Sequence, residues 1–355
     1  MSHFCLLSDP ENYAAIDWDL LKDDAARVHW LDHFEKHFRK TLEYANNWYG
    51  RRAASRIELA GEEFQAVIDK LRTQPGSLPH GKLDLIELGR LRGEILTRHD
   101  IDDPFAAIKV RENTAAMEIY PETVHDLHLL DGDQKWLHLM ECVFAGNIFD
   151  LGAMETMHLA DEGESFIQLA ERIKPRPWLI DDFDALAAQL GTAPPMPWVK
   201  AIVFVDNAGS DFVLGLMPLV RELALGGTQI ILAANETPSL NDITVDEVID
   251  VVERLAAVDS DLAALIDGQM FEVVSTGSGI PLIDLSDVSD ELNAAAEDAD
   301  CVIIEGMGRA IESNLDAKFN VDCIRLAVLK DAVVAERNGG GLYDCVCKYT
   351  PVSDS

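Results

Sequence analysis

The chain has 355 residues with 63 acidic and 29 basic side chains, which gives a formal net charge of −34 at pH 7. This charge argues against binding to nucleic acids or acidic membranes, because such binding relies on Lys and Arg to neutralise phosphates. The hydrophobic content of 48% indicates a soluble globular protein, and no apolar stretch approaches the ~20 residues of a membrane span. At roughly 150 residues per domain, the length predicts two domains.

The N-terminus and the cysteines indicate the cellular environment. The first ten residues lack a basic start and a sustained apolar core, so we expect no signal peptide. The six cysteines form no disulfide framework, and four of them fall in predicted strands, where a small buried thiol packs well. We therefore expect a cytoplasmic, reducing location, and the sequence is compatible with a homo-oligomer.

The first part of the chain is expected to be mostly helical. Apolar residues recur at helical spacing over 23–46, 53–72, 84–99 and 135–145. The stretch 191–198 contains three prolines and is interpreted as a connection. We therefore expect a helical domain at 1–190 that contributes to a substrate cleft, and a second domain at 191–355.

The second part is predicted to alternate between strands and helices. Five short apolar runs have the character of buried parallel strands, over 201–205, 228–234, 271–275, 301–304 and 323–329. Helices are expected over 210–225, 244–257 and 331–337, and a last strand over 342–348. This alternation predicts a doubly wound, largely parallel α/β sheet with a mostly helical N-terminal domain.

Polar residues follow the predicted strands, where α/β proteins bind their ligands. They are Asp206-Asn207, Asn235-Glu236, Thr276 to Gly279, Glu305 to Arg309, and Lys330. One polar strand end is ordinary, whereas five that supply oxygens, glycines and a lysine predict a site. Because consecutive strands are often neighbours, Asp206 and Asp242 are expected to approach one ion.

Histidines are not expected at this site. All ten lie at or before residue 158. His29, His33 and His37 fall at i, i+4 and i+8 on a helix, but without a carboxylate in register we interpret them as ordinary helix-face residues. A metal at the strand ends is therefore expected to have oxygen ligands, which suit hard ions such as Mg²⁺ or Mn²⁺.

Neither glycine pair completes a dinucleotide-binding fingerprint. Leu282 and Ile311 stand where the pairs at 277–279 and 306–308 would need a third glycine. The glycines either let backbone amides approach an anion or merely shape turns. Lys330 likewise either meets an anion or begins a solvated helix.

These segments resemble the metal-dependent damage-control phosphatase family (ARMT-like domain), in the branch also found fused to pantothenate-kinase-like proteins. The matching segments are 146–150, 206–211, 232–235, 241–244, 305–309, 329–330 and 340–344. Glu-Gly-Met-Gly-Arg at 305–309 is the branch signature, and Leu151 stands where a tryptophan is expected.

The resemblance implies a hydrolase that acts on phosphate monoesters with a divalent metal, Mn, Mg, Co or Ni. It implies that Asp206, Asn207 and Asp242 bind the metal and that Lys330 contacts the phosphate. Residues expected at the substrate are Asn147, Asp150, Asn235, Glu305, Gly306, Gly308, Arg309 and Lys330. Asp206 is either a nucleophile or only a ligand. Asp211 is either a general base, a partner of the metal ligands, or a residue that complements a helix dipole.

The implied substrate is a small-molecule phosphate ester, 4′-phosphopantetheine or a damaged derivative, whereas other branches act on sugar phosphates. A nucleotide-cofactor enzyme such as a methyltransferase is the alternative from another class. Its glycine loop should follow the first strand, which here ends in Asp206-Asn207. A non-catalytic ligand sensor is a third alternative, and the intact set of Asp206, Asn207, Asp242 and Lys330 argues against it.

Overall fold

The computed structural model describes residues 2–78, 81–148, 173–191 and 194–352. A seven-stranded sheet lies at its centre, in the order β1-β7-β6-β5-β2-β3-β4. The strands are β1 (Ile180–Asp181), β2 (Lys200–Phe204), β3 (Gln229–Ala234), β4 (Phe271–Ser275), β5 (Cys301–Glu305), β6 (Asp322–Val328) and β7 (Cys345–Thr350). Among the strand pairs of the described residues, only β6–β7 is antiparallel. The prediction of a doubly wound, largely parallel sheet is therefore confirmed.

Buried apolar side chains of the strands alternate between two cores, one on each face of the sheet. In β2, Ile202 and Phe204 belong to one core, whereas Ala201 and Val203 belong to the other. This alternation follows from the period of two along a strand, and burial on both faces explains why the strand is apolar throughout.

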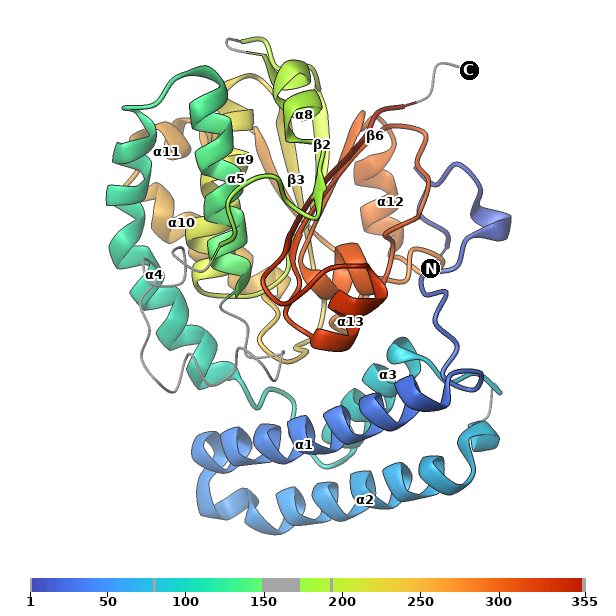
Figure 1. Ribbon diagram of the computed structural model, residues 1–355. Coiled ribbons are helices and arrows are strands. Elements are labelled where there is room, and N and C mark those ends of the chain that lie inside the picture. The colour runs from blue at the N-terminus through green and yellow to red at the C-terminus, as the bar shows by residue number, and fades with distance from the viewer. Residues whose placement is uncertain (1, 79–80, 149–172, 192–193, 353–355) are drawn as a thin grey trace.

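In the described part of the chain, one face of the sheet is covered by a set of helices that share its core (Figure 1). They are α4 (Ala106–Leu127), α5 (Gly132–Ile148), α8 (Phe183–Leu190), α9 (Met217–Leu225), α10 (Val245–Ala256) and α11 (Ser260–Asp267). None of the helices in the described ranges combines the length and apolar composition that a membrane crossing requires.

The other core combines sheet residues with the remaining helices. These are α1 (Asp24–Tyr49), α2 (Ala54–Thr73), α3 (Leu85–Arg98), α12 (Asp290–Ala296) and α13 (Ala332–Arg337). Figure 1 shows α1, α2 and α3 grouped below the sheet, on the side where α13 begins; we call these three the helical layer. Asp23 and Asp84 cap α1 and α3 by accepting backbone N–H groups of the first turn. Short 3₁₀ turns are η1 (Pro10–Asn12), η2 (Gly50–Ala53) and η3 (Pro75–Ser77).

The five strands predicted first lie within one residue of their expected bounds, and the predicted helices within three. The last strand, β7, begins three residues later than expected. The sequence pattern did not predict α4, which has Pro121 in its interior, because proline normally breaks a helix. Both α4 and α5 pack on the sheet rather than in the helical layer, and the domain boundary at residue 190 stays an expectation.

The strand order places a crevice between the carboxyl ends of β2 and β5. From β2 the chain moves outward through β3 to β4, and it then returns to the other side of β2 to form β5 and β6. Such a reversal of direction is where doubly wound sheets bind ligands. The first residues beyond β2 and the last residue of β5 therefore flank the expected site.

Helix α5 approaches this crevice closely because it carries a glycine there. A Cβ on Gly146 would lie 2.8 Å from Asp211 Cα and from Ser210 O. Asp211 begins the π-helical segment η4 (Asp211–Leu216), which follows β2, and Ser210 is the residue before it. The missing side chain therefore lets the end of α5 reach the carboxyl ends of the strands.

We expect Gly146→Ala to destabilise the protein by roughly 1–3 kcal/mol, because a methyl group must displace backbone atoms. Gly93→Ala in α3 is the matched control, since a Cβ there meets nothing within 4 Å and alanine is the better helix former by ~1 kcal/mol. Urea unfolding measures both variants. Equal stabilities would contradict the close approach of α5.

Candidate active site at the carboxyl ends of the strands

The loops that follow β2 and β3 lie side by side and bring two aspartates together. Ile243 N donates to Asp206 O at 3.0 Å, and an isolated antiparallel bridge joins Asn207 to Asp242. Both aspartates are almost fully buried. The structure thus brings Asp206, Asn207 and Asp242 together.

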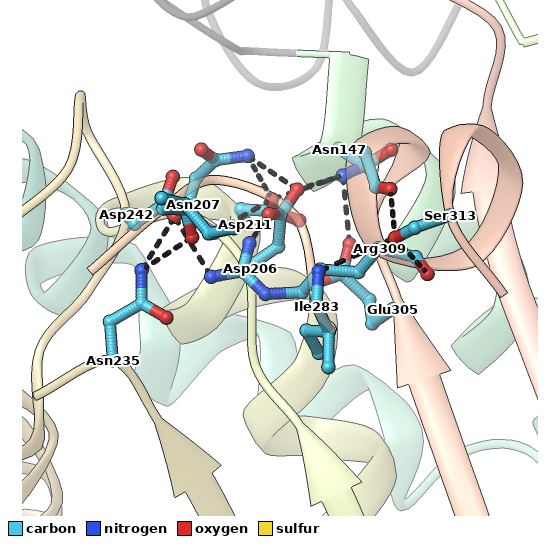
Figure 2. A network of polar contacts seen from close by, with 12 residues as sticks. Asn147, Asp206, Asn207, Asp211, Asn235, Asp242, Ile283, Glu305, Arg309 and Ser313 are labelled. Carbon is cyan, nitrogen blue, oxygen red and sulfur yellow. Dashed lines mark hydrogen bonds and ion pairs between the residues drawn. The ribbon is translucent and has the colours of Figure 1, made fainter. Parts of the chain in front are cut away.

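The guanidinium of Arg309 joins the two aspartates. Its Nη1 donates to Asp206 Oδ1, and its Nη2 donates to Asp242 Oδ2 at 2.9 Å (Figure 2). Arg309 lies in the π-helical segment η5 (Gly308–Glu312), which follows β5. Two buried carboxylates without a cation would be costly, and Arg309 supplies the positive charge in this structure.

A second acidic group adjoins Asp206. Asp206, Asp211 and Glu305, here called the inner carboxylates, each offer an oxygen within 4.8 Å of the others, and such a group could hold a metal ion. Asn207 Nδ2 donates to Asp206 Oδ2 at 2.9 Å and to Asp211 Oδ2 at 2.8 Å. The strand order explains the group, because Asp211 follows β2 and Glu305 ends the neighbouring β5.

Asn147, at the end of α5, contacts all three inner carboxylates. Its Nδ2 lies 2.8 Å from Glu305 Oε1, 3.1 Å from Asp211 Oδ2 and 3.4 Å from Asp206 Oδ2 (Figure 2). Asn147 therefore lies opposite Asp206, as expected of the cleft. Asp150, expected beside it, lies outside the described residues.

Lys330 is fully buried beyond the end of β6. Its Nζ donates to the backbone oxygen of Asn147 at 2.7 Å. The lysine thus brings a positive charge close to the inner carboxylates, and it fixes the end of α5. Its expected contact with a phosphate stays a prediction.

The remaining predicted substrate residues have packing or orienting contacts in the structure. Gly306 has φ +99, and a Cβ there would overlap the Asp206 carboxylate, 2.2 Å from Oδ2. A Cβ on Gly308 would lie 2.7 Å from Pro281 O. Asn235 Nδ2 donates to Asp242 Oδ2 at 2.9 Å. These contacts hold both aspartates in place, and the expected contacts with substrate stay predictions.

A cavity of about 80 Å³, here called the small cavity, opens beside the two aspartates. Its wall on the sheet side includes Asp206, Asn207, Asn241 and Asp242. The helical layer contributes His33 from α1 and Arg92 from α3. Asp211, Glu305 and Lys330 are not among the described residues of this wall.

A larger groove of about 760 Å³ lies next to the small cavity, and Arg92 and Leu240 line both. The groove runs between α3 and the loops that follow β3 and β4. Its size falls within the ~300–1,000 Å³ typical of small-molecule sites. The small cavity and the groove together can accept a ligand with a small polar end and a longer body.

Two histidines of α1 lie beside a carboxylate that is distant in the sequence. His29 Nε2 is 3.1 Å from Asp331 Oδ2, and His33 Nδ1 is 3.9 Å from the same oxygen. Asp331 supplies the carboxylate that the histidine spacing lacks locally, and the three residues form a second group able to hold a metal. Imidazole nitrogens therefore lie near the end of β6, and the expectation that a metal at the strand ends has oxygen ligands stays a prediction.

The oxygens around Asp242 fit a hard divalent cation, which prefers carboxylate and amide oxygens. Asn235 Oδ1 and Asn241 Oδ1 are buried and have no hydrogen-bond partner among the described residues, a state that a cation or a water would relieve. Asn207 directs its nitrogen at Asp206. To bind an ion, this amide would have to present its oxygen.

The family of the chain follows from comparison with known proteins. The model of the damage-control phosphatase ARMT1-like domain matches residues 31–346. A damage-control phosphatase of Arabidopsis thaliana is 39% identical over 302 residues, which cover 84% of this chain and 81% of that protein. The chain belongs to the ARMT1-like damage-control phosphatase family, and the resemblance seen in its motifs is confirmed.

Other relatives are longer proteins. Pantothenate kinase 2 of Arabidopsis thaliana is 36% identical over 380 residues, which cover 99% of this chain and 42% of that protein. The 4′-phosphopantetheine phosphatase of Mus musculus is 30% identical over 397 residues, with coverages of 97% and 48%. This chain thus spans less than half the length of either protein. The fold of this chain is similar to the crystal structure of a DUF89 family protein from Pyrococcus horikoshii. The TM-score is 0.60 at 18% sequence identity, and the match covers 91% of this chain and 97% of that one.

Replacing Asn147 by Asp should destabilise the metal-free protein by roughly 3 kcal/mol or more, because a donor to three buried carboxylates becomes a fourth charge. Asn113→Asp is the matched control, since Asn113 is also buried but accepts a hydrogen bond from Gly209 N, which an aspartate can also do. Urea unfolding in EDTA compares the two variants. Similar losses of stability in the two variants would show that Asn147 does not donate to the three carboxylates.

Stability should also fall in acid because of His33. Burial lowers the pKa of His33 from 6.5 to about 4, although Asp331 opposes the shift. The unfolded chain therefore binds more protons between pH 6.5 and 4, so stability decreases as the pH falls through this window. At ~1.4 kcal/mol per pH unit the contribution reaches about 3 kcal/mol. The measurement is the free energy of unfolding in EDTA at pH 7 and at pH 4. It should decrease less between these two pH values for His33→Gln than for the control His125→Gln, a change at an exposed position of α4.

Proposed function

We propose that this phosphatase-family chain is a metal-dependent phosphomonoesterase that acts on a small metabolite, 4′-phosphopantetheine or a damaged derivative. The observation that carries the proposal is the small cavity, where two buried aspartates and the Asn207 amide border a space adjoining a large groove. A divalent ion held there would polarise a phosphoryl oxygen and offset the charge that develops during transfer.

Access from the small cavity supports the choice of metal ligands. Asp206, Asn207 and Asp242 line this cavity, and an ion that acts on a substrate must be reached from it. Asp211 and Glu305 are not part of its described wall. We therefore assign the ion to Asp206, Asn207 and Asp242. These oxygen donors are compatible with Mn, Mg, Co or Ni.

The other polar residues are proposed to support this arrangement. Asp211 accepts hydrogen bonds from the backbone N of Asn207 at 3.3 Å and from its Nδ2 at 2.8 Å. These contacts favour a role for Asp211 in positioning Asn207. Arg309 and Lys330 supply positive charge in a strongly anionic protein, and preorganised charges of this kind stabilise a phosphoryl transition state. Asp206 acts either as the nucleophile or as a ligand that orients a water.

The groove supports a substrate with an extended organic part. Hydroxyl and guanidinium groups line it, among them Thr41, Arg90, Arg98, Thr237, Ser239 and Ser278. Such groups can bind the amide and hydroxyl oxygens of a pantetheine chain. The name of the Mus musculus relative, 4′-phosphopantetheine phosphatase, points to the same substrate.

The protein should hydrolyse p-nitrophenyl phosphate and 4′-phosphopantetheine with Mg²⁺, Mn²⁺, Co²⁺ or Ni²⁺, and EDTA should abolish the reaction. Asp242→Asn should weaken Mn²⁺ binding in calorimetry and lower kcat/KM by about 10²–10³, the loss typical of removing a key charge-stabilising group. Glu305→Gln is the matched control, because it removes one charge from a carboxylate outside the described cavity wall.

The pair of variants also tests the ligand assignment. If Glu305→Gln loses Mn²⁺ affinity while Asp242→Asn keeps it, the ion is held by the inner carboxylates instead. If no phosphate ester is hydrolysed with any of the four metals, the proposed activity is wrong.

A further inference from the structure

Arg92 is a buried cation that forms no ion pair with the carboxylates of the described residues. It lies on α3 with 5% of its surface exposed, and its Nη2 has no hydrogen-bond partner among the described residues. Its guanidinium lies over the ring of Phe34, 5.4 Å from the centroid. Burial lowers the pKa of Arg92 to about 10, with Asp242 opposing the shift, so the side chain remains charged at neutral pH.

Other buried arginines of this protein are satisfied, which makes Arg92 exceptional. Arg221 pairs with Asp259 at 2.6 Å, and Arg309 contacts both aspartates of the site. Arg325 donates from Nε to the backbone oxygen of Asn314 at 2.9 Å. A buried charge without a partner costs several kcal/mol, and the described residues supply no such partner, so the position of Arg92 favours binding of an anion.

Three carboxylates that border the same cavity, those of Asp206, Asp242 and Asp331, have other partners. Asp206 and Asp242 both contact Arg309. Asp331 accepts from His29 and also caps α13 through the backbone N–H groups of residues 333 and 334. Arg92 nevertheless borders the small cavity together with Asp206 and Asp242, and it also borders the large groove. A ligand that passes from the groove into the cavity would meet its guanidinium.

We propose that Arg92 binds the phosphoryl group of the substrate, and the phosphate product, in the small cavity. The inference rests on the proposed function and deepens it, because it places the anion of the substrate between α3 and the metal ligands. The volume of about 80 Å³ leaves room for a few waters or one small tetrahedral anion. A guanidinium fork matches phosphate oxygens in geometry and charge, and desolvation strengthens the contact.

This assignment also accounts for the balance of charge in the cavity. A phosphate monoester carries nearly two negative charges at neutral pH, and it would enter a space bordered by the carboxylates of Asp206, Asp242, Glu312 and Asp331. A divalent ion on the sheet side and Arg92 on the helical side would together offset the added charge. The helical layer then supplies part of the active site, in a segment outside every motif that carries the family resemblance.

Three variants of the full chain test the inference. Arg92→Met keeps an unbranched apolar side chain that can pack beside Phe34 but removes the charge, and Arg92→Lys keeps a charge without the fork. Arg72→Met in α2 is the matched control, because Arg72 is exposed, pairs with Asp32 and Glu35, and is not among the residues that line the groove or the small cavity. Binding of inorganic phosphate is measured by calorimetry and thermal unfolding, in EDTA and with Mg²⁺.

We expect phosphate to bind the wild type and Arg72→Met equally, and to bind Arg92→Met at least tenfold more weakly. Without phosphate, Arg92→Met should unfold at the same temperature as the wild type or higher, because an unneutralised buried charge has been removed. Arg92→Lys should bind phosphate with intermediate affinity. With p-nitrophenyl phosphate, Arg92→Met should raise KM at least tenfold and change kcat less. A purely structural role for Arg92 would instead lower stability in both variants and leave phosphate affinity unchanged.

The inference is overturned if Arg92→Met binds phosphate within threefold of the wild type, or if the wild type does not bind phosphate under either condition. Phosphate binding through Arg92 without hydrolysis of any ester would refute the proposed function and leave the inference intact. Hydrolysis that depends on Asp242 but not on Arg92 would refute the inference and leave the proposed function intact.

Discussion

The amide of Asn147 lies among three buried carboxylates, and the geometry of the site depends on this contact. The carboxylates come from the ends of β2 and β5, whereas Asn147 comes from α5 on the face of the sheet. Its Oδ1 accepts from Val328 N in β6 at 3.2 Å, and its backbone oxygen accepts from Lys330. One side chain thereby couples three strands to one helix, and the missing side chain of Gly146 is what allows the helix to come so close.

The acidic residues of the site are divided into an inner and an outer set, with Asp206 shared by both. On the inner side, the amides of Asn147 and Asn207 donate to Glu305 and Asp211, which are not part of the described cavity wall. On the outer side, Asp206 and Asp242 face a space that a ligand can reach, and a guanidinium joins them. The inner set can therefore remain fixed while the charge on the outer side changes with metal or substrate. We propose that this division lets a protein of net charge −34 present a local site for an anion.

Sequence reasoning succeeded where the determining information is local. A buried strand is short and apolar, and the residue after it lies at the edge of the sheet, so Asp206, Glu305 and Lys330 were expected there. The nearness of Asp242 followed because β2 and β3 are consecutive and adjacent. The pairing of Asp331 with His29 joins residues 302 positions apart, and no local spacing encodes it. The inner carboxylates depend on β5 returning beside β2, a strand order that periodicity does not determine.

Arg92 was missed for a different reason, because nothing in its local sequence separates it from the exposed arginines of the same helix. Its character appears only once packing is known, since burial without a partner is a property of the fold. The helical layer shares one apolar core with Ile202 and Phe204 of the sheet, so the position of α3 relative to the strand ends is set by side-chain packing. The free energy that it costs to bury Arg92 is then offset by the folding stability of that core, and not by the free energy of binding an anion. A cation held in this way needs no further ordering when an anion binds. A preorganised charge in a site with little water stabilises negative charge most strongly for this reason.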